Sequence, residues 1–186
     1  MVQTNEIGEE TLRDKLCAKI IVDLSTPKRS ALVKAGMRSG KSLLVCDVFQ
    51  RGGFKQLFII GNRLPHSKSV AQSACEYMNK TPECVVACDP SFIYTDDFVN
   101  GKYSNSLVAI DEAMWITNSY SLFEDARKYA PTIAVSSRGP EYDEDDRWKL
   151  EAGYSFATWE LHPYLIYVAD SLDFNDQVVR RDYLAY

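Results

Sequence analysis

The sequence has few of the groups from which zinc sites, disulfide frameworks and membrane spans are made. Its 186 residues include two histidines, His66 and His162, and five cysteines with no Cys-x-x-Cys pair. This spacing argues against a zinc site. An odd number of cysteines without a signal peptide argues for free thiols in a reducing compartment. No apolar run approaches the ~20 residues that cross a membrane. We therefore expect a soluble, cytoplasmic protein with no membrane partner.

An excess of positive charge is also lacking. The chain has 21 Lys and Arg against 26 Asp and Glu, which gives a formal net charge of −5. Such a chain has no general electrostatic attraction to nucleic acid. Any DNA contact must then come from a local basic patch, from assembly of subunits or from another domain. Hydrophobic residues make up 46% of the sequence, which is enough for one globular domain with a core.

Short apolar runs alternate with segments of helical periodicity along most of the chain. The pattern predicts strands at 31–35, 56–60, 84–87, 107–110 and 132–135. It predicts helices at 5–19, 42–49, 67–79 and 120–129. Beyond a charged stretch at 141–147, which reads as a solvated loop, we expect one more strand at 154–159 and a helix at 176–183. Nearly continuous apolar strands separated by helices indicate an α/β fold, with a mostly parallel sheet covered on both faces.

One glycine-containing segment fits the Walker A pattern of a phosphate-binding loop. The nucleotide-binding residues would be Ala35, Gly36, Met37, Arg38, Ser39, Gly40, Lys41 and Ser42. The segment follows an apolar strand and precedes a helix, as this motif requires. Its glycines allow the backbone to turn so that N–H groups face an anion. Lys41 would reach the β- and γ-phosphates of ATP as a catalytic residue, and Ser42 would place its hydroxyl on Mg²⁺.

An acidic pair, Asp111–Glu112, follows the apolar run at 107–110. Residues at the carboxyl end of a strand in a parallel sheet lie where such sheets bind ligands. Asp111 would hold Mg²⁺, and Glu112 would activate the attacking water as a general base. A helix with an acidic first turn is the simpler alternative, but the phosphate-binding loop upstream favours the catalytic interpretation.

A second polar strand end follows the apolar run at 132–135. Ser136 and Ser137 stand there and are candidate sensor and coupling residues that report loss of the γ-phosphate. The alternative is that they only end the strand.

An arginine usually stabilises the charge of the transferred phosphoryl group. Arg38 lies inside the phosphate-binding loop and could act in cis as a catalytic residue. Arg127 and Arg138 are candidates to act in trans on a neighbouring subunit. Surface solvation remains the alternative for each arginine.

Together these motifs resemble one family, the large terminase subunits of tailed bacteriophages, which pump DNA into capsids. An arginine within the Walker A segment is similar to the terminase form of that motif. Asp111-Glu112-Ala113 resembles its Walker B motif, and Ser136–Ser137 fits its coupling motif. Two later segments are similar to stretches that accompany the terminase ATPase domain: TWELHP at 158–163 and RRDYLA at 180–185.

The resemblance implies a three-layer P-loop NTPase fold of the RecA/ASCE-like type. Residues 1–150 would form the ATPase core. Residues 151–186 would complete the ATPase domain and lead to a nuclease domain that is absent or separately encoded.

The resemblance further implies an Mg²⁺-dependent ATPase that translocates double-stranded viral DNA. It would act as a homo-oligomeric ring in the host cytoplasm, transiently at the procapsid. A portal and a small terminase or separate nuclease subunit would be its partners. Two alternatives stay open: another P-loop ring translocase or helicase-like ATPase lobe, and an ATP-binding switch module that does not hydrolyse its nucleotide.

Overall fold

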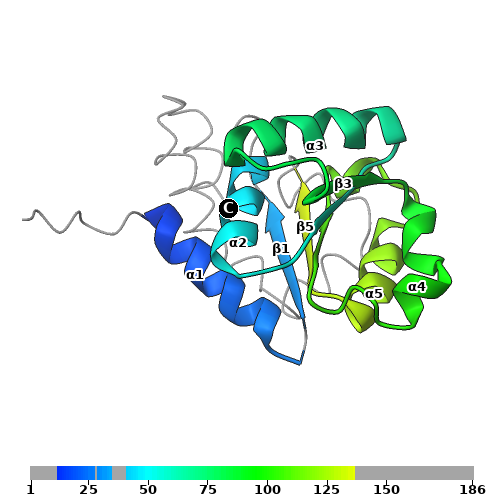
Figure 1. The fold of residues 1–186 in the computed structure, drawn as a ribbon. Helices are drawn as coiled ribbons and strands as arrows, with labels where there is room; N and C mark the ends of the chain where they lie inside the picture. Colours follow the sequence, from blue (N-terminus) through cyan, green and yellow to red (C-terminus); the bar gives the residue numbers. More distant parts are fainter. Residues whose placement is uncertain (1–11, 28, 35–40, 137–186) are drawn as a thin grey trace, which may run out of the picture.

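The computed structural model describes residues 12–27, 29–34 and 41–136 (Figure 1). Five parallel strands of this part of the chain form one sheet in the order β1-β5-β4-β2-β3. They are β1 (Ser30–Lys34), β2 (Leu57–Ile60), β3 (Val85–Cys88), β4 (Leu107–Ile110) and β5 (Thr132–Ser136). The predicted α/β class is therefore confirmed, with every described strand pair parallel.

Helices pack against both faces of this sheet, and Figure 1 shows α1 and α2 on the side opposite α5. The first face carries α1 (Leu12–Ser25), α2 (Lys41–Arg51) and α3 (Leu64–Met78). The second carries η1 (Pro90–Tyr94), α4 (Asp96–Val99), η2 (Ala113–Trp115) and α5 (Ser119–Tyr129). This arrangement is compatible with a three-layer α/β fold.

Side chains of each strand alternate between the two cores. In β4, Leu107 and Ala109 pack with α1, α2 and α3, whereas Val108 and Ile110 pack with α5. All four are buried. Burial on both faces explains why the run is apolar without interruption, as expected for a covered parallel sheet.

The strands match the sequence prediction to within a residue at either end, but the helices differ more. Helix α1 continues to Ser25 instead of ending at Lys19, because Ile20 and Leu24 are buried in the same core as Leu16. Helix α3 begins at Leu64, three residues before the predicted start. The residue after Leu64 is a proline, which is favoured in the first turn of a helix.

The short helices η1 and α4 were not predicted, because elements of four or five residues show too little periodicity. Their residues Phe92 and Phe98 pack around Phe58 of β2 and Tyr103, with ring centroids of neighbouring pairs 4.6–5.4 Å apart. These contacts join residues distant in sequence, so the pattern along the chain does not reveal them.

Several predictions concern residues outside the described ranges: the start of the first helix, the charged loop at 141–147, the strand at 154–159, the helix at 176–183 and the whole segment 151–186. They stay predictions. In the part of the chain that the structure describes, no helix has the length and apolarity to cross a membrane.

The strand order decides which residues meet at the carboxyl edge of the sheet. Strand β5 lies between β1 and β4, with Ser136 opposite Lys34 on one side and Ala134 opposite Ile110 on the other. Segments that leave β1, β5, β4 and β2 therefore emerge at one edge. Both predicted Walker motifs follow strands that end there.

Candidate active site

The first two residues of α2 supply a cation and a hydroxyl to this edge. Lys41 is buried, with 6% of its surface exposed. Ser42, the next residue in the first turn of α2, is exposed. A lysine is rarely buried unless its ammonium group has partners. The preceding loop residues lie outside the described ranges: Ala35, Gly36, Met37, Arg38, Ser39 and Gly40.

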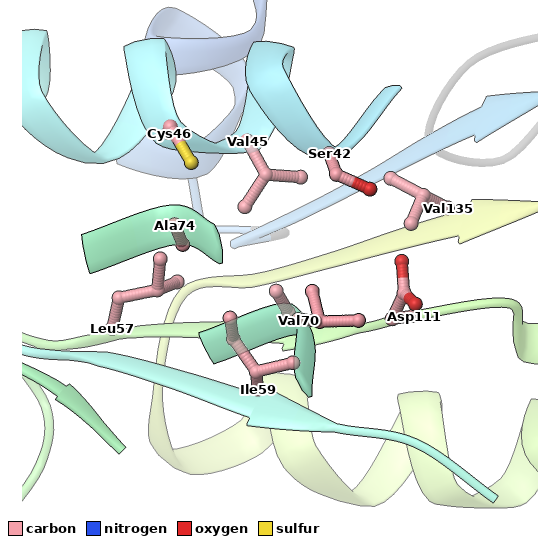
Figure 2. A pocket seen from close by; sticks show the side chains of 10 residues that line it. Ser42, Val45, Cys46, Leu57, Ile59, Val70, Ala74, Asp111 and Val135 are labelled. Carbon is pink, nitrogen blue, oxygen red and sulfur yellow. The ribbon is translucent and has the colours of Figure 1, made fainter. Parts of the chain in front are cut away.

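Asp111 leaves the carboxyl end of β4 and is also 6% exposed. Its backbone N–H donates a hydrogen bond of 2.8 Å to the carbonyl oxygen of Ile60, which extends the β2–β4 pairing by one residue. Asp111 and Ser42 line the same cavity of about 10 Å³ between α2 and the sheet. Figure 2 shows the carboxylate and the hydroxyl directed toward the space beside Val135. The fold therefore places these two predicted Mg²⁺ ligands together.

Glu112 has an uncommon backbone conformation. Its φ of 48° and ψ of 52° lie in the left-handed region, at the start of η2. A residue with a side chain pays about 1–2 kcal/mol for this conformation, and such strain is concentrated at functional sites. The conformation turns the chain sharply away from β4 directly after Asp111.

The charged groups of this site interact electrostatically. Burial lowers the pKa of Lys41, while Glu112 and Asp111 act in the opposite direction and favour its charged form. Burial also raises the pKa of Asp111; a hydrogen bond from His66 opposes the increase, and the negative charge of Glu112 adds to it. One buried cation therefore interacts with two carboxylates, so the site offers groups of both signs, one for phosphate oxygens and the others for a metal cation.

Sequence reasoning missed one member of this cluster, His66. Its Nε2 lies 2.8 Å from Oδ2 of Asp111. His66 stands in the first turn of α3, which follows β2, and β2 is the hydrogen-bonded neighbour of β4. The available signal was positional: in a parallel sheet, a polar residue shortly after one strand lies near the residue that ends the adjacent strand.

The connection from β2 to α3 is closely packed around His66. The backbone N–H of Gly61 donates a 2.9 Å hydrogen bond to Ser67 Oγ. A Cβ atom at Gly61 would lie 2.9 Å from Cδ2 of His66 and 3.0 Å from Ser67 Oγ. Both distances are too short for unstrained contact, so glycine at this position leaves the room that the imidazole occupies.

The predicted sensor Ser136 is the last residue of β5 and is buried. Because β5 lies between β1 and β4, Ser136 ends the strand between the one that precedes the predicted phosphate-binding loop and the one that precedes Asp111. Ser137 and Arg138 lie outside the described ranges, and their predicted roles stay predictions.

Arg127 lies at the other edge of the sheet. Its guanidinium forms an ion pair with Glu124, with 2.8 Å between Nε and Oε1, and donates a 3.3 Å hydrogen bond to Ser30 Oγ. Ser30 begins β1, and the predicted phosphate-binding loop follows the end of β1, about 13 Å away at ~3.3 Å per residue. Arg127 therefore does not reach the site of its own subunit, and its action on a neighbour stays a prediction.

The oxygen atoms of Ser42 and Asp111 fit Mg²⁺ only if a bound nucleotide supplies further ligands. Among the described residues, no three His, Cys, Asp or Glu side chains gather into a group that could hold a metal ion. Mg²⁺, however, is commonly held by one or two carboxylates together with waters and substrate phosphates. A hydroxyl from Ser42 and a carboxylate from Asp111, lining one cavity, match that pattern when a nucleotide supplies the remaining oxygens.

No protein-family model matches the chain, and a search of curated proteins finds no significant relative.

Proposed function

We propose that this protein is an Mg²⁺-dependent ATPase. One observation carries the proposal: Lys41 and Ser42 at the start of α2 meet Asp111 and Glu112 at the end of β4 on one edge of a parallel sheet. These two pairs of residues are about 70 positions apart in sequence. Their meeting at the ligand-binding edge is what a nucleotide site requires.

Each side chain has a task that its surroundings support. Lys41, partly desolvated and close to two carboxylates, would place its charge on the β- and γ-phosphates. Glu112, held by its left-handed backbone, would accept a proton from the attacking water. Ser42 and Asp111 would hold Mg²⁺, which neutralises charge on the phosphate oxygens when bound.

Ser136 supports a link between hydrolysis and the rest of the domain. It ends the strand between the two motif-bearing strands. A hydroxyl at that point would be near the γ-phosphate and could report its loss through β5 to the packed core.

What the ATPase would move is a separate and more specific proposal. Similarity to the terminase motifs favours double-stranded DNA packaging by a ring of subunits. That similarity includes the segments TWELHP and RRDYLA, which lie outside the described residues. A different ring translocase, a helicase-like ATPase or a switch module would use the same nucleotide site, so the ATPase proposal does not depend on the load.

Replacing Lys41 with Ala tests the site. We expect this variant to lose ATP turnover, because the phosphates lose their buried cation. Lys55→Ala is the matched control, since Lys55 is an exposed lysine of the turn before β2. Release of phosphate, measured with Mg²⁺ present, should be abolished by the first change and unaffected by the second. Turnover of Lys41→Ala near the wild-type rate would show that the site is misassigned.

A further inference from the structure

His66 contacts a residue of the proposed site without belonging to either Walker motif. Its Nε2 lies 2.8 Å from Oδ2 of Asp111. With Asp111 ionised, the carboxylate only accepts hydrogen bonds, and Nε2 then carries the proton and donates the hydrogen bond. The bond occupies one acceptor position on Oδ2, and the carboxylate keeps its other oxygen for a second interaction. Figure 2 shows Asp111 directed toward the space beside Ser42.

The surrounding backbone holds the imidazole in place. His66 stands on the first turn of α3, whose start contains a proline and whose Ser67 accepts a hydrogen bond from Gly61. Gly61 itself has no side chain to displace the ring, since a Cβ there would approach Cδ2 of His66 to 2.9 Å. On the other side, the Asp111 backbone is fixed to Ile60. Both partners of the His66–Asp111 hydrogen bond are thus anchored to β2.

We propose that His66 is a positioning residue that orients the Asp111 carboxylate toward the Mg²⁺ that accompanies the nucleotide. This inference rests on the proposed ATPase function, because it assigns Asp111 to the metal. A carboxylate that binds a metal is usually itself hydrogen-bonded, and loss of the outer partner weakens metal binding or activity by about 10–100-fold.

A merely structural role fits His66 less well. Its side chain is 42% exposed, whereas Asp111 is almost fully buried. Removing a ring that is 42% exposed leaves no large cavity in the core, so hydrophobic packing should change little. The effect of His66 should instead appear in the orientation of the buried carboxylate that it contacts.

The test separates metal-dependent from metal-independent nucleotide binding. The affinity for a fluorescent ATP analogue is measured with excess Mg²⁺ and again with EDTA, and the ratio of the two affinities reports the metal's contribution. We expect His66→Ala to lower this ratio about tenfold, with the affinity in EDTA unchanged. His66→Gln, whose amide can donate to Asp111, should restore part of the ratio. Ser69→Ala, a change at an exposed position of α3, should match the wild type.

A double-mutant cycle then asks whether His66 acts through Asp111. In an Asp111→Ala background, the His66→Ala change should have no further effect on the ratio. An unchanged ratio in His66→Ala, or a full effect of His66→Ala without Asp111, overturns the inference while leaving the ATPase proposal in place. A wild-type protein that binds no nucleotide overturns the ATPase proposal, and the inference falls with it.

Discussion

The left-handed backbone at Glu112 leads to an unusual prediction: replacing the proposed catalytic base with glycine should leave the protein more stable than replacing it with alanine. Glu112 has φ 48° and ψ 52°. A left-handed conformation costs a residue with a side chain about 1–2 kcal/mol, and glycine avoids this cost. The extra freedom of glycine in the unfolded chain offsets about 0.5–1 kcal/mol.

The net expectation is that the free energy of unfolding of Glu112→Gly exceeds that of Glu112→Ala by about 0.5–1 kcal/mol. For a chain of this length, that corresponds to a rise in Tm of about 1–4 °C. Glu112→Ala is the matched control, because it removes the same carboxylate but keeps the strained conformation. The difference between the two variants isolates the backbone from any electrostatic effect on Lys41 or Asp111.

Gly53 provides the reverse comparison. It has φ of +68°, and a Cβ atom there would meet nothing within 4 Å. Gly53→Ala should therefore lose about as much stability as Glu112→Gly gains over Glu112→Ala. Urea unfolding followed by circular dichroism measures all three. If Glu112→Gly is no more stable than Glu112→Ala while Gly53→Ala is destabilised, the strain assigned to Glu112 is wrong.

Two further variants test the electrostatics of the sheet edges. Burial raises the pKa of Asp111, so its contribution to stability is full below the ordinary pKa of about 3.9 and is lost as the pH rises through the folded-state value. The stability of Asp111→Asn relative to the wild type should therefore increase as the pH rises above about 4, as urea titrations at several pH values can show; a difference independent of pH would contradict this. Arg127→Ala should lower the free energy of unfolding by about 1 kcal/mol, because it breaks a partly buried ion pair with Glu124 and the bond to Ser30. The same loss should not recur in a Glu124→Ala background, and a full second loss would show that the pair is not coupled.

The sheet could be predicted from the sequence because its strands are buried on both faces. The run at 107–110 is apolar at every position and coincides with β4. The start of α2 was also expected within one residue. The meeting of Lys41 with Asp111 followed from the rule that ligands bind at the carboxyl edge of parallel strands, without any knowledge of strand order.

Features that depend on tertiary contacts were not predictable in the same way. His66 lies beside Asp111 because β2 pairs with β4, and no local sequence pattern encodes that pairing. The left-handed backbone of Glu112 was equally hidden, since a glutamate rarely adopts it. The aromatic contacts of η1 and α4 with Phe58 join separate segments, and only the folded chain brings them together.

We propose that Glu112 activates water at an ATP site formed with Lys41 and Asp111. The most direct measurement compares phosphate release by the wild type and by Glu112→Gln, with Mg²⁺ and with or without double-stranded DNA, alongside ATP binding by both. We expect hydrolysis by the wild type, equal ATP binding by the two proteins and a kcat lower by about 100-fold or more in Glu112→Gln. Equal turnover by the two proteins, or no hydrolysis by the wild type under any of these conditions, would contradict it.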